Sequence, residues 1–196
     1  MIAVARFVLA AGVILTATVA FAEDTASVPL DLVPDGYRVT ERHSFNLGAQ
    51  SGSYTDWHRY DLASFDGFAT VLEVPQIYGK PKDKWAAVVK IQFFVHGQME
   101  KPSFALLFMA DRKTERIHAL VERGDDISRF DVTFGLRERV QVVVTPQSAE
   151  KLDVRIGGTK IEMPTPNHIE GIALIGSGLD VTFEPFTMLG KKSPDR

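Results

Sequence analysis

The sequence predicts an all-β protein, an antiparallel β-sandwich of the jelly-roll type with about ten strands and little helix. Residues 85–95 alternate between two faces, as a long half-buried strand does. Strand-like runs then recur every 8–12 residues or so, separated by short intervals rich in turn-forming residues. No window shows sustained helical periodicity. Connections this short favour antiparallel hairpins, because parallel crossovers need a dozen or more residues.

The stretch WAAVVKIQFFV, residues 85–95, is the longest two-faced run. One face carries only apolar side chains, from Trp85, Ala87, Val89, Ile91, Phe93 and Val95. The other face is mixed and extends to residue 96, with Ala86, Val88, Lys90, Gln92, Phe94 and His96. Since side chains alternate across a strand, the first face is predicted to lie in the core.

Residues 1–22 have the features of a secretory signal peptide. Arg6 supplies a positive start, residues 7–21 are an apolar run, and Ala20-Phe21-Ala22 fits the small-residue cleavage pattern. That run is shorter than the about 20 apolar residues of a membrane span. We therefore expect a periplasmic or secreted protein with no integral membrane span after cleavage.

The rest of the chain is predicted to form one sandwich domain at residues 23–189 and a polar tail at 190–196. The chain has no cysteine, which excludes disulfides, thiol nucleophiles and cysteine-ligated metals. Its formal net charge is −3 and it has no basic block, so no nucleic-acid partner is expected.

The strands before residue 85 are less regular than those after it. Residues 54–65 are aromatic but polar and are assigned to no element, and residues 75–84 are predicted to be an exposed connection with three lysines. Gly157-Gly158 indicates a tight turn, and Pro185 indicates a bulge or an edge position. The expected strands are residues 37–47, 68–74, 85–95, 103–110, 115–122, 128–134, 139–145, 151–156, 159–163, 169–175 and 179–188.

The C-terminal half carries a family resemblance. RERVQVVVTPQSAEKLDVRIGGTKIEM is a strand, a loop, a strand ending in glycine and a short returning strand, and HIEGIALIGSGLDVTFEPFTML adds a glycine-flanked strand and a closing strand. Over about residues 138–188 this order resembles concanavalin A-like lectin/glucanase jelly rolls, including laminin-G-like domains. The resemblance implies a fold, and fold does not imply function.

Functional motifs of that superfamily are missing from the sequence. Laminarinase-type glucanases carry alternating carboxylates on one strand, whereas Glu115, Glu122, Asp131 and Asp153 fall on different predicted strands or strand ends. Metal ligands of the legume-lectin kind are also absent from the sequence. No cofactor is therefore predicted.

The non-core face of the strands between residues 85 and 134 is the predicted ligand site. It would bring together cations, an amide, an acid and aromatic rings, which suit sugar hydroxyls and sugar C–H faces. A solvated side of an antiparallel sheet would carry similar residues. Trp57, in an aromatic cluster with Tyr54, His58 and Tyr60, is added as a flanking residue, although such rings more often cap a core. The candidate ligand-binding residues are Lys90, Gln92, Phe94, His96, Arg116, His118, Arg129, Asp131 and Trp57.

Metal binding and catalysis have less support in the sequence than sugar binding. The five histidines show no zinc-binding spacing, and no serine sits in a nucleophile-elbow motif. Asp131 with Glu115 or Glu122 would be the acid/base pair of an enzyme. Gly124-Asp125-Asp126 is either a hairpin turn or a source of calcium-binding oxygens.

Three functions follow as hypotheses. The first is a non-catalytic carbohydrate-binding or adhesion-type module. The second is a glycoside hydrolase or polysaccharide lyase on the same fold. The third is a structural or assembly protein of the envelope that binds another protein.

Overall fold

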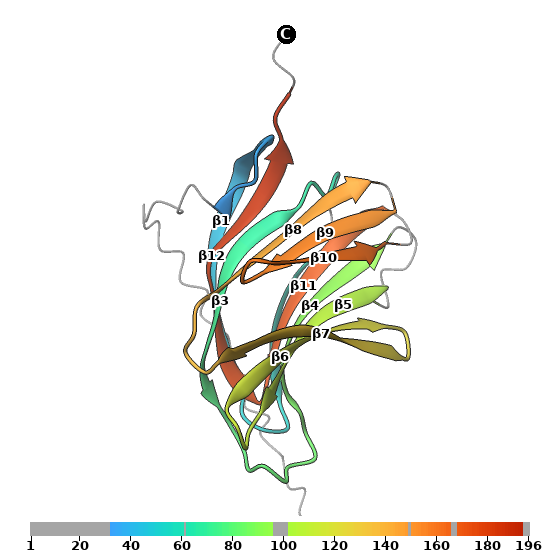
Figure 1. Ribbon diagram of the computed structural model, residues 1–196. Helices are drawn as coiled ribbons and strands as arrows, with labels where there is room; N and C mark the ends of the chain where they lie inside the picture. The colour runs from blue at the N-terminus through green and yellow to red at the C-terminus, as the bar shows by residue number, and fades with distance from the viewer. Residues whose placement is uncertain (1–31, 61, 96–101, 149, 166–167, 194–196) are drawn as a thin grey trace, which may run out of the picture.

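The computed structural model describes residues 32–60, 62–95, 102–148, 150–165 and 168–193. Within these residues the chain forms twelve strands in two six-stranded sheets, and no α-helix (Figure 1). All neighbouring strands pair antiparallel. The predicted all-β antiparallel sandwich is confirmed.

The two sheets interleave along the chain. Sheet A has the order β1 (Tyr37–Gly48), β12 (Leu179–Lys191), β3 (Phe68–Ile77), β8 (Val140–Ser148), β9 (Lys151–Ile156) and β10 (Thr159–Pro164). Sheet B has the order β2 (Tyr54–Arg59), β11 (Ile169–Ser177), β4 (Ala87–Val95), β5 (Phe104–Asp111), β6 (Arg116–Arg123) and β7 (Asp126–Gly135). The last two strands therefore insert between strands formed early in the chain, one in each sheet.

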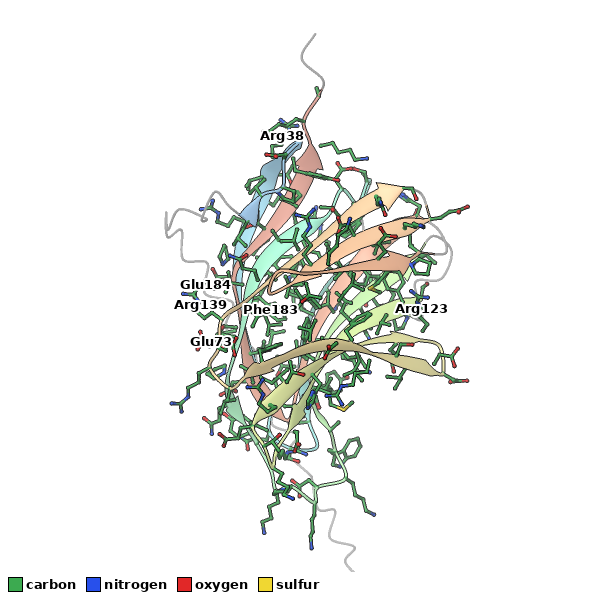
Figure 2. The ribbon with its side chains drawn as sticks, viewed as in Figure 1. Arg38, Glu73, Arg123, Arg139, Phe183 and Glu184 are labelled. Carbon is green, nitrogen blue, oxygen red and sulfur yellow. The ribbon has the colours of Figure 1, made fainter. Side chains whose placement is uncertain are left out.

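Aromatic rings join the two sheets across the core. Phe186 of β12 stacks on Phe68 of β3 with ring centroids 5.0 Å apart. Phe68 stacks on Phe93 of β4 at 6.3 Å, and Phe93 on Phe104 of β5 at 4.6 Å. These four rings, which we call the phenylalanine column, are at most 2% exposed. Phe183 lies beside the column in the interior (Figure 2).

The strand periodicity read from the sequence holds along most of the chain. On β6, Ile117, Ala119 and Val121 are buried in the core, as expected from the alternation. Both faces of β5 are buried, in line with its uniformly apolar sequence. Gly157 and Gly158 form the turn between β9 and β10 with φ of 55° and 89°. Glycine adopts such angles without steric cost, which matches the hairpin preference for positive φ at both turn positions.

Three features differ from the prediction. There are twelve strands rather than about ten, and residues 54–59 of the unassigned stretch form β2. Of the two alternatives for Pro185, the bulge is confirmed as a register shift between Phe183 and Phe186, within the interior strand β12. β12 also continues to Lys191, two residues into the predicted tail.

Trp85 is not a core residue, contrary to the alternation that included it. It precedes β4, whose ladder with β5 begins at Ala87, and it is 64% exposed. The Trp85 carbonyl accepts a hydrogen bond from the Arg112 side chain instead of a strand partner. The inward–outward alternation of β4 stops where its ladder with β5 stops, so the Trp85 side chain remains exposed to solvent.

The segment before β1 covers part of the outer face of sheet A. Leu32 is 2% exposed and packs with Ala69, Val143 and Leu189. These three residues lie on neighbouring strands and point away from the main core. The lead-in is thus part of the packed domain from residue 32 onward.

We expect Phe186→Ala to lower the free energy of unfolding by about 3–5 kcal/mol, because it removes a fully buried ring and leaves a cavity. Urea denaturation followed by circular dichroism measures this loss. Val39→Ala, at a 40% exposed strand position, serves as the control and should change stability by less than about 0.5 kcal/mol. If the two substitutions lowered stability equally, the phenylalanine column would not be a main contributor to the stability of the core.

Candidate functional site

The outer face of sheet B is the side that points away from sheet A, and we call it the B face. No third strand layer lies on it in the described part of the chain. The strand register aligns its side chains in rows across β4, β5 and β6. These rows are Gln92–Ala105–Glu122, Lys90–Leu107–Leu120 and Val88–Met109–His118.

The centre of the B face combines an ion pair with an apolar floor. Lys90 Nζ lies 3.1 Å from Glu122 Oε2, and both side chains are 29% exposed. Because β5 lies between β4 and β6, this ion pair spans β5. Beneath lie buried apolar side chains that form a small cluster of their own, Val88, Ala105 and Leu107, with Leu120 packed against them. The floor residues Val88, Ala105 and Leu107 are at most 7% exposed.

A basic cluster lies on β6 and β7. Arg129 donates a hydrogen bond to His118 Nδ1, and the Thr133 hydroxyl lies 3.0 Å from the same nitrogen. Arg116 reaches toward the Thr133 carbonyl at 3.5 Å. The ladder between β6 and β7 is irregular between His118 and Leu120. The irregularity places exposed Asp131 in the same region of β7 as Arg129.

Aromatic rings lie at the opposite, β2 side of the B face. Tyr60, 42% exposed, stacks on His58 at 4.8 Å and meets Phe94 edge-on at 4.9 Å. His58 Nδ1 lies 3.3 Å from Asp56 Oδ2. Two adjacent rings of this group, His58 and Tyr60, are thus accessible to a ligand.

The structure brings most of the predicted site residues onto one face. Lys90, Gln92 and His118 are partly buried, whereas Arg116, Arg129 and Asp131 are exposed. Phe94 is only 4% exposed, so its ring supports Tyr60 more than it offers a surface. His96 lies outside the described residues.

Trp57 does not lie on the B face. Its ring packs 4.5 Å from Phe45 and 6.0 Å from Phe186, on the core side of β2. Alternation explains this placement, since Trp57 points inward while its neighbours Asp56 and His58 point outward. Of the aromatic cluster named from the sequence, Tyr60 lies at the B face instead, as its contacts with His58 and Phe94 show.

Trp57 borders a polar cluster at the edge where β1 and β2 close the sandwich. Glu41 of β1 accepts a hydrogen bond from Arg59 of β2, and His43 Nε2 lies 3.3 Å from the same carboxylate oxygen. The hydrogen bond from Arg59 holds the pKa of Glu41 below its ordinary value, against the raising effect of burial, and His43 adds to the lowering. This ion pair connects the edge strands of the two sheets.

The carboxylates considered for catalysis are spread along β6 and β7. Glu115 lies in the turn just before β6 and Glu122 lies next to the last residue of β6, so most of the length of that strand separates them. The two carboxyl groups of glycosidases lie within about 10 Å of each other. Among the described residues there is no group of three or more His, Asp or Glu side chains suited to a metal ion, and no helix with the length and hydropathy of a membrane span.

Comparison with known proteins gives similarity in fold only. No family model matches the chain, and no curated protein is similar to it in sequence. Galectin LEC-6 of Caenorhabditis elegans is 12% identical, with 79% of this chain and 96% of that chain covered and a TM-score of 0.43. An alginate lyase from Alteromonas sp. 272 is 10% identical, with 76% and 79% covered and a TM-score of 0.46.

A scytalido-glutamic peptidase is 13% identical, with 75% of this chain and 76% of that chain covered and a TM-score of 0.43. All three TM-scores are below 0.5, so these proteins carry no argument about activity. The B face has to be interpreted from its own residues.

The Glu41–Arg59 pair predicts a pH-dependent contribution to stability. Because folding lowers the pKa of Glu41, the contribution is complete above its ordinary value of 4.5 and is lost as the pH falls through the folded value. Glu41→Gln should therefore lower the urea midpoint at about pH 7, and this effect should shrink steadily as the pH is lowered below 4.5.

The matched control is Glu150→Gln, at an exposed position between β8 and β9. We expect its urea midpoint to follow the unsubstituted protein at about pH 7 and below pH 4.5. A Glu41→Gln effect of the same size in both pH ranges would show that the ion pair does not carry the difference.

Proposed function

We propose that this chain is a non-catalytic carbohydrate-binding or adhesion-type protein of an exported compartment, and that a polysaccharide lies along the B face. The observation that supports this proposal most directly is the arrangement of side chains in rows across the B face. Polar side chains on β4 and β6 stand on either side of an apolar floor on β5. A sugar ring presents hydroxyls at its rim, which these polar side chains complement, whereas its C–H faces would stack on the exposed rings of Tyr60 and His58 because the floor itself is buried.

The polar groups suit hydroxyl recognition. Gln92 offers both a donor and an acceptor, and Arg129 offers several donors in one plane. Lys90 and Glu122 keep each other oriented at 3.1 Å, so less rotamer freedom remains to be lost when a ligand binds. Binding sites that combine a few placed polar groups with apolar and aromatic surface are typical for small-molecule and sugar ligands.

The exposed rings on the β2 side provide a stacking surface. Tyr60 is held between His58 and Phe94, at 4.8 Å and 4.9 Å, so its orientation is set before a ligand arrives. A path across the B face from Tyr60 to the basic cluster crosses strands β11, β4, β5 and β6. At the usual strand spacing of about 4.8 Å, that path accommodates several sugar units rather than one.

An enzymatic role is the second candidate and has less support. Glu122 is paired with Lys90, and Glu115 is at the far end of the same strand. An enzyme of this kind would need Asp131 at catalytic distance from one of these two carboxylates, and that of Glu122 is already engaged by Lys90. Binding without bond cleavage is the function that the B face supports best.

The test is polysaccharide binding by a variant that carries Lys90→Gln, His118→Gln and Arg129→Gln together. Insoluble chitin, cellulose and peptidoglycan are used in pull-downs, and alginate and dextran in affinity gel electrophoresis. We expect the unsubstituted protein to bind at least one of them. The triple variant should bind it at least about tenfold more weakly, which corresponds to about 1.4 kcal/mol.

The matched control carries Arg38→Gln, His168→Gln and Lys192→Gln, which removes the same three residue types from exposed positions away from the centre of the B face. Arg38 lies at the end of the molecule where β12 finishes (Figure 2). Both variants should keep the circular dichroism spectrum and urea midpoint of the unsubstituted protein. Binding that survives in the B-face variant would refute the site.

A further inference from the structure

One end of the sandwich carries a cluster of lysines and exposed aromatic rings. It is formed by the connections before β2, before β4 and between β5 and β6, at the end opposite the C-terminal end of β12 (Figure 1). We call this surface the tip. Its members are Tyr54, Lys80, Lys82, Lys84, Trp85 and Lys113.

Arg112 holds the connections of the tip together. Its Nε donates to the Tyr78 carbonyl at 2.6 Å, and one of its terminal nitrogens donates to the Trp85 carbonyl at 2.7 Å. The turn after β5 is thereby fixed to both ends of the segment that carries Lys80, Lys82 and Lys84. Hydrogen bonds from a charged donor to carbonyls are stronger than neutral ones, so the tip is an ordered surface.

Two acidic groups of the tip, Asp83 and Asp111, are used inside its own turns. The Asp83 carboxylate accepts hydrogen bonds from the Ser51 hydroxyl at 3.0 Å and the Lys80 backbone amide at 2.9 Å. Asp111 accepts from the Lys113 amide and the Thr114 hydroxyl, both at 2.8 Å. These bonds lower the pKa of both carboxyls, so both remain charged but turned toward the protein.

The lysines of the tip face solvent. Lys80, Lys82, Lys84 and Lys113 are all exposed, and none is in a salt bridge with another described residue. Other lysines of the chain are paired, such as Lys90 with Glu122 and Lys151 with Glu162. Together with Arg112 these four lysines outnumber the carboxylates of Asp83, Asp111 and Glu115, so the tip is net positive in a chain of net charge −3.

Two large rings accompany these charges. Tyr54 is 70% exposed and Trp85 is 64% exposed, the two highest values among the large hydrophobic residues described. Trp85 lies against Gly52, where an added Cβ would be 3.5 Å from the indole, so the ring rests on the turn before β2. Exposed tryptophan and tyrosine beside lysines are the residue types that anchor proteins at membrane–water interfaces.

We propose that the tip docks the protein on the surface of an anionic lipid bilayer. The surface belongs to loops at the end of the molecule rather than to a groove, so it can approach a plane with several lysines at once. Each lysine near an anionic surface contributes an attraction that salt screens, and Trp85 and Tyr54 enter the headgroup region. This docking does not depend on sugar binding by the B face.

The test is co-sedimentation with two kinds of vesicle, phosphatidylcholine alone and phosphatidylcholine with phosphatidylglycerol. All proteins are expressed from the full-length gene, so that they share the same processing. We expect binding to the phosphatidylglycerol vesicles only, and a strong decrease between low and high salt. Lys80→Gln, Lys82→Gln and Lys84→Gln together should weaken binding at least about tenfold.

Tryptophan fluorescence gives a second readout. The emission of Trp85 should shift to shorter wavelength on the anionic vesicles, and Trp85→Phe should abolish that shift, because Trp57 is packed against the core. The charge-matched control carries Lys151→Gln, Lys191→Gln and Lys192→Gln, all on sheet A or just after it. It should bind like the unsubstituted protein.

Equal binding to both kinds of vesicle, or equal loss in both triple variants, would overturn the proposal. So would an absence of vesicle binding combined with lysine-dependent binding of the tip to alginate or heparin, since the partner would then be an acidic polysaccharide. The B-face variant should keep vesicle binding, which separates a failure here from a failure of the sugar-binding function.

Discussion

The packing of the phenylalanine column is the interaction on which the two-layer structure depends. Its rings come from β12 and β3 in sheet A and from β4 and β5 in sheet B. β12 is close to the C-terminus, yet it lies between β1 and β3, and β11 lies likewise between β2 and β4. Neither sheet is continuous until the end of the chain has been placed, so the core requires contacts between residues far apart in sequence.

Because one face of sheet B is buried in the core, the side chains that alternate with the core residues must lie on its other face. With Ile91 and Phe93 in the core, Lys90 and Gln92 must point outward from the same strand. The apolar floor of the B face arises because β5 is apolar on both sides, and the ion pair between Lys90 and Glu122 spans it. The candidate site is therefore a consequence of the alternation, placed by the register of three neighbouring strands.

The B face and the tip are two surfaces with different chemistry. The B face has paired charges, an amide and oriented rings, which suit a ligand with many hydroxyl groups. The tip has exposed lysines and two exposed rings, and the carboxylates of Asp83 and Asp111 are bound to its own turns. A protein with both surfaces would hold a polysaccharide close to a bilayer, with each surface separable by substitution.

The sequence by itself determined the strands after residue 85, the inward residues of β6 and the turn at Gly157-Gly158, because period and turn chemistry are local properties. It also placed Lys90, Gln92 and His118 on outward positions. Only the tertiary structure decided that Glu122 is the partner of Lys90, that Trp57 faces the core and that Trp85 is exposed. Those facts depend on the order of the strands and on where each ladder ends. Both are set by contacts between residues that are distant in sequence, so no local sequence pattern predicts them.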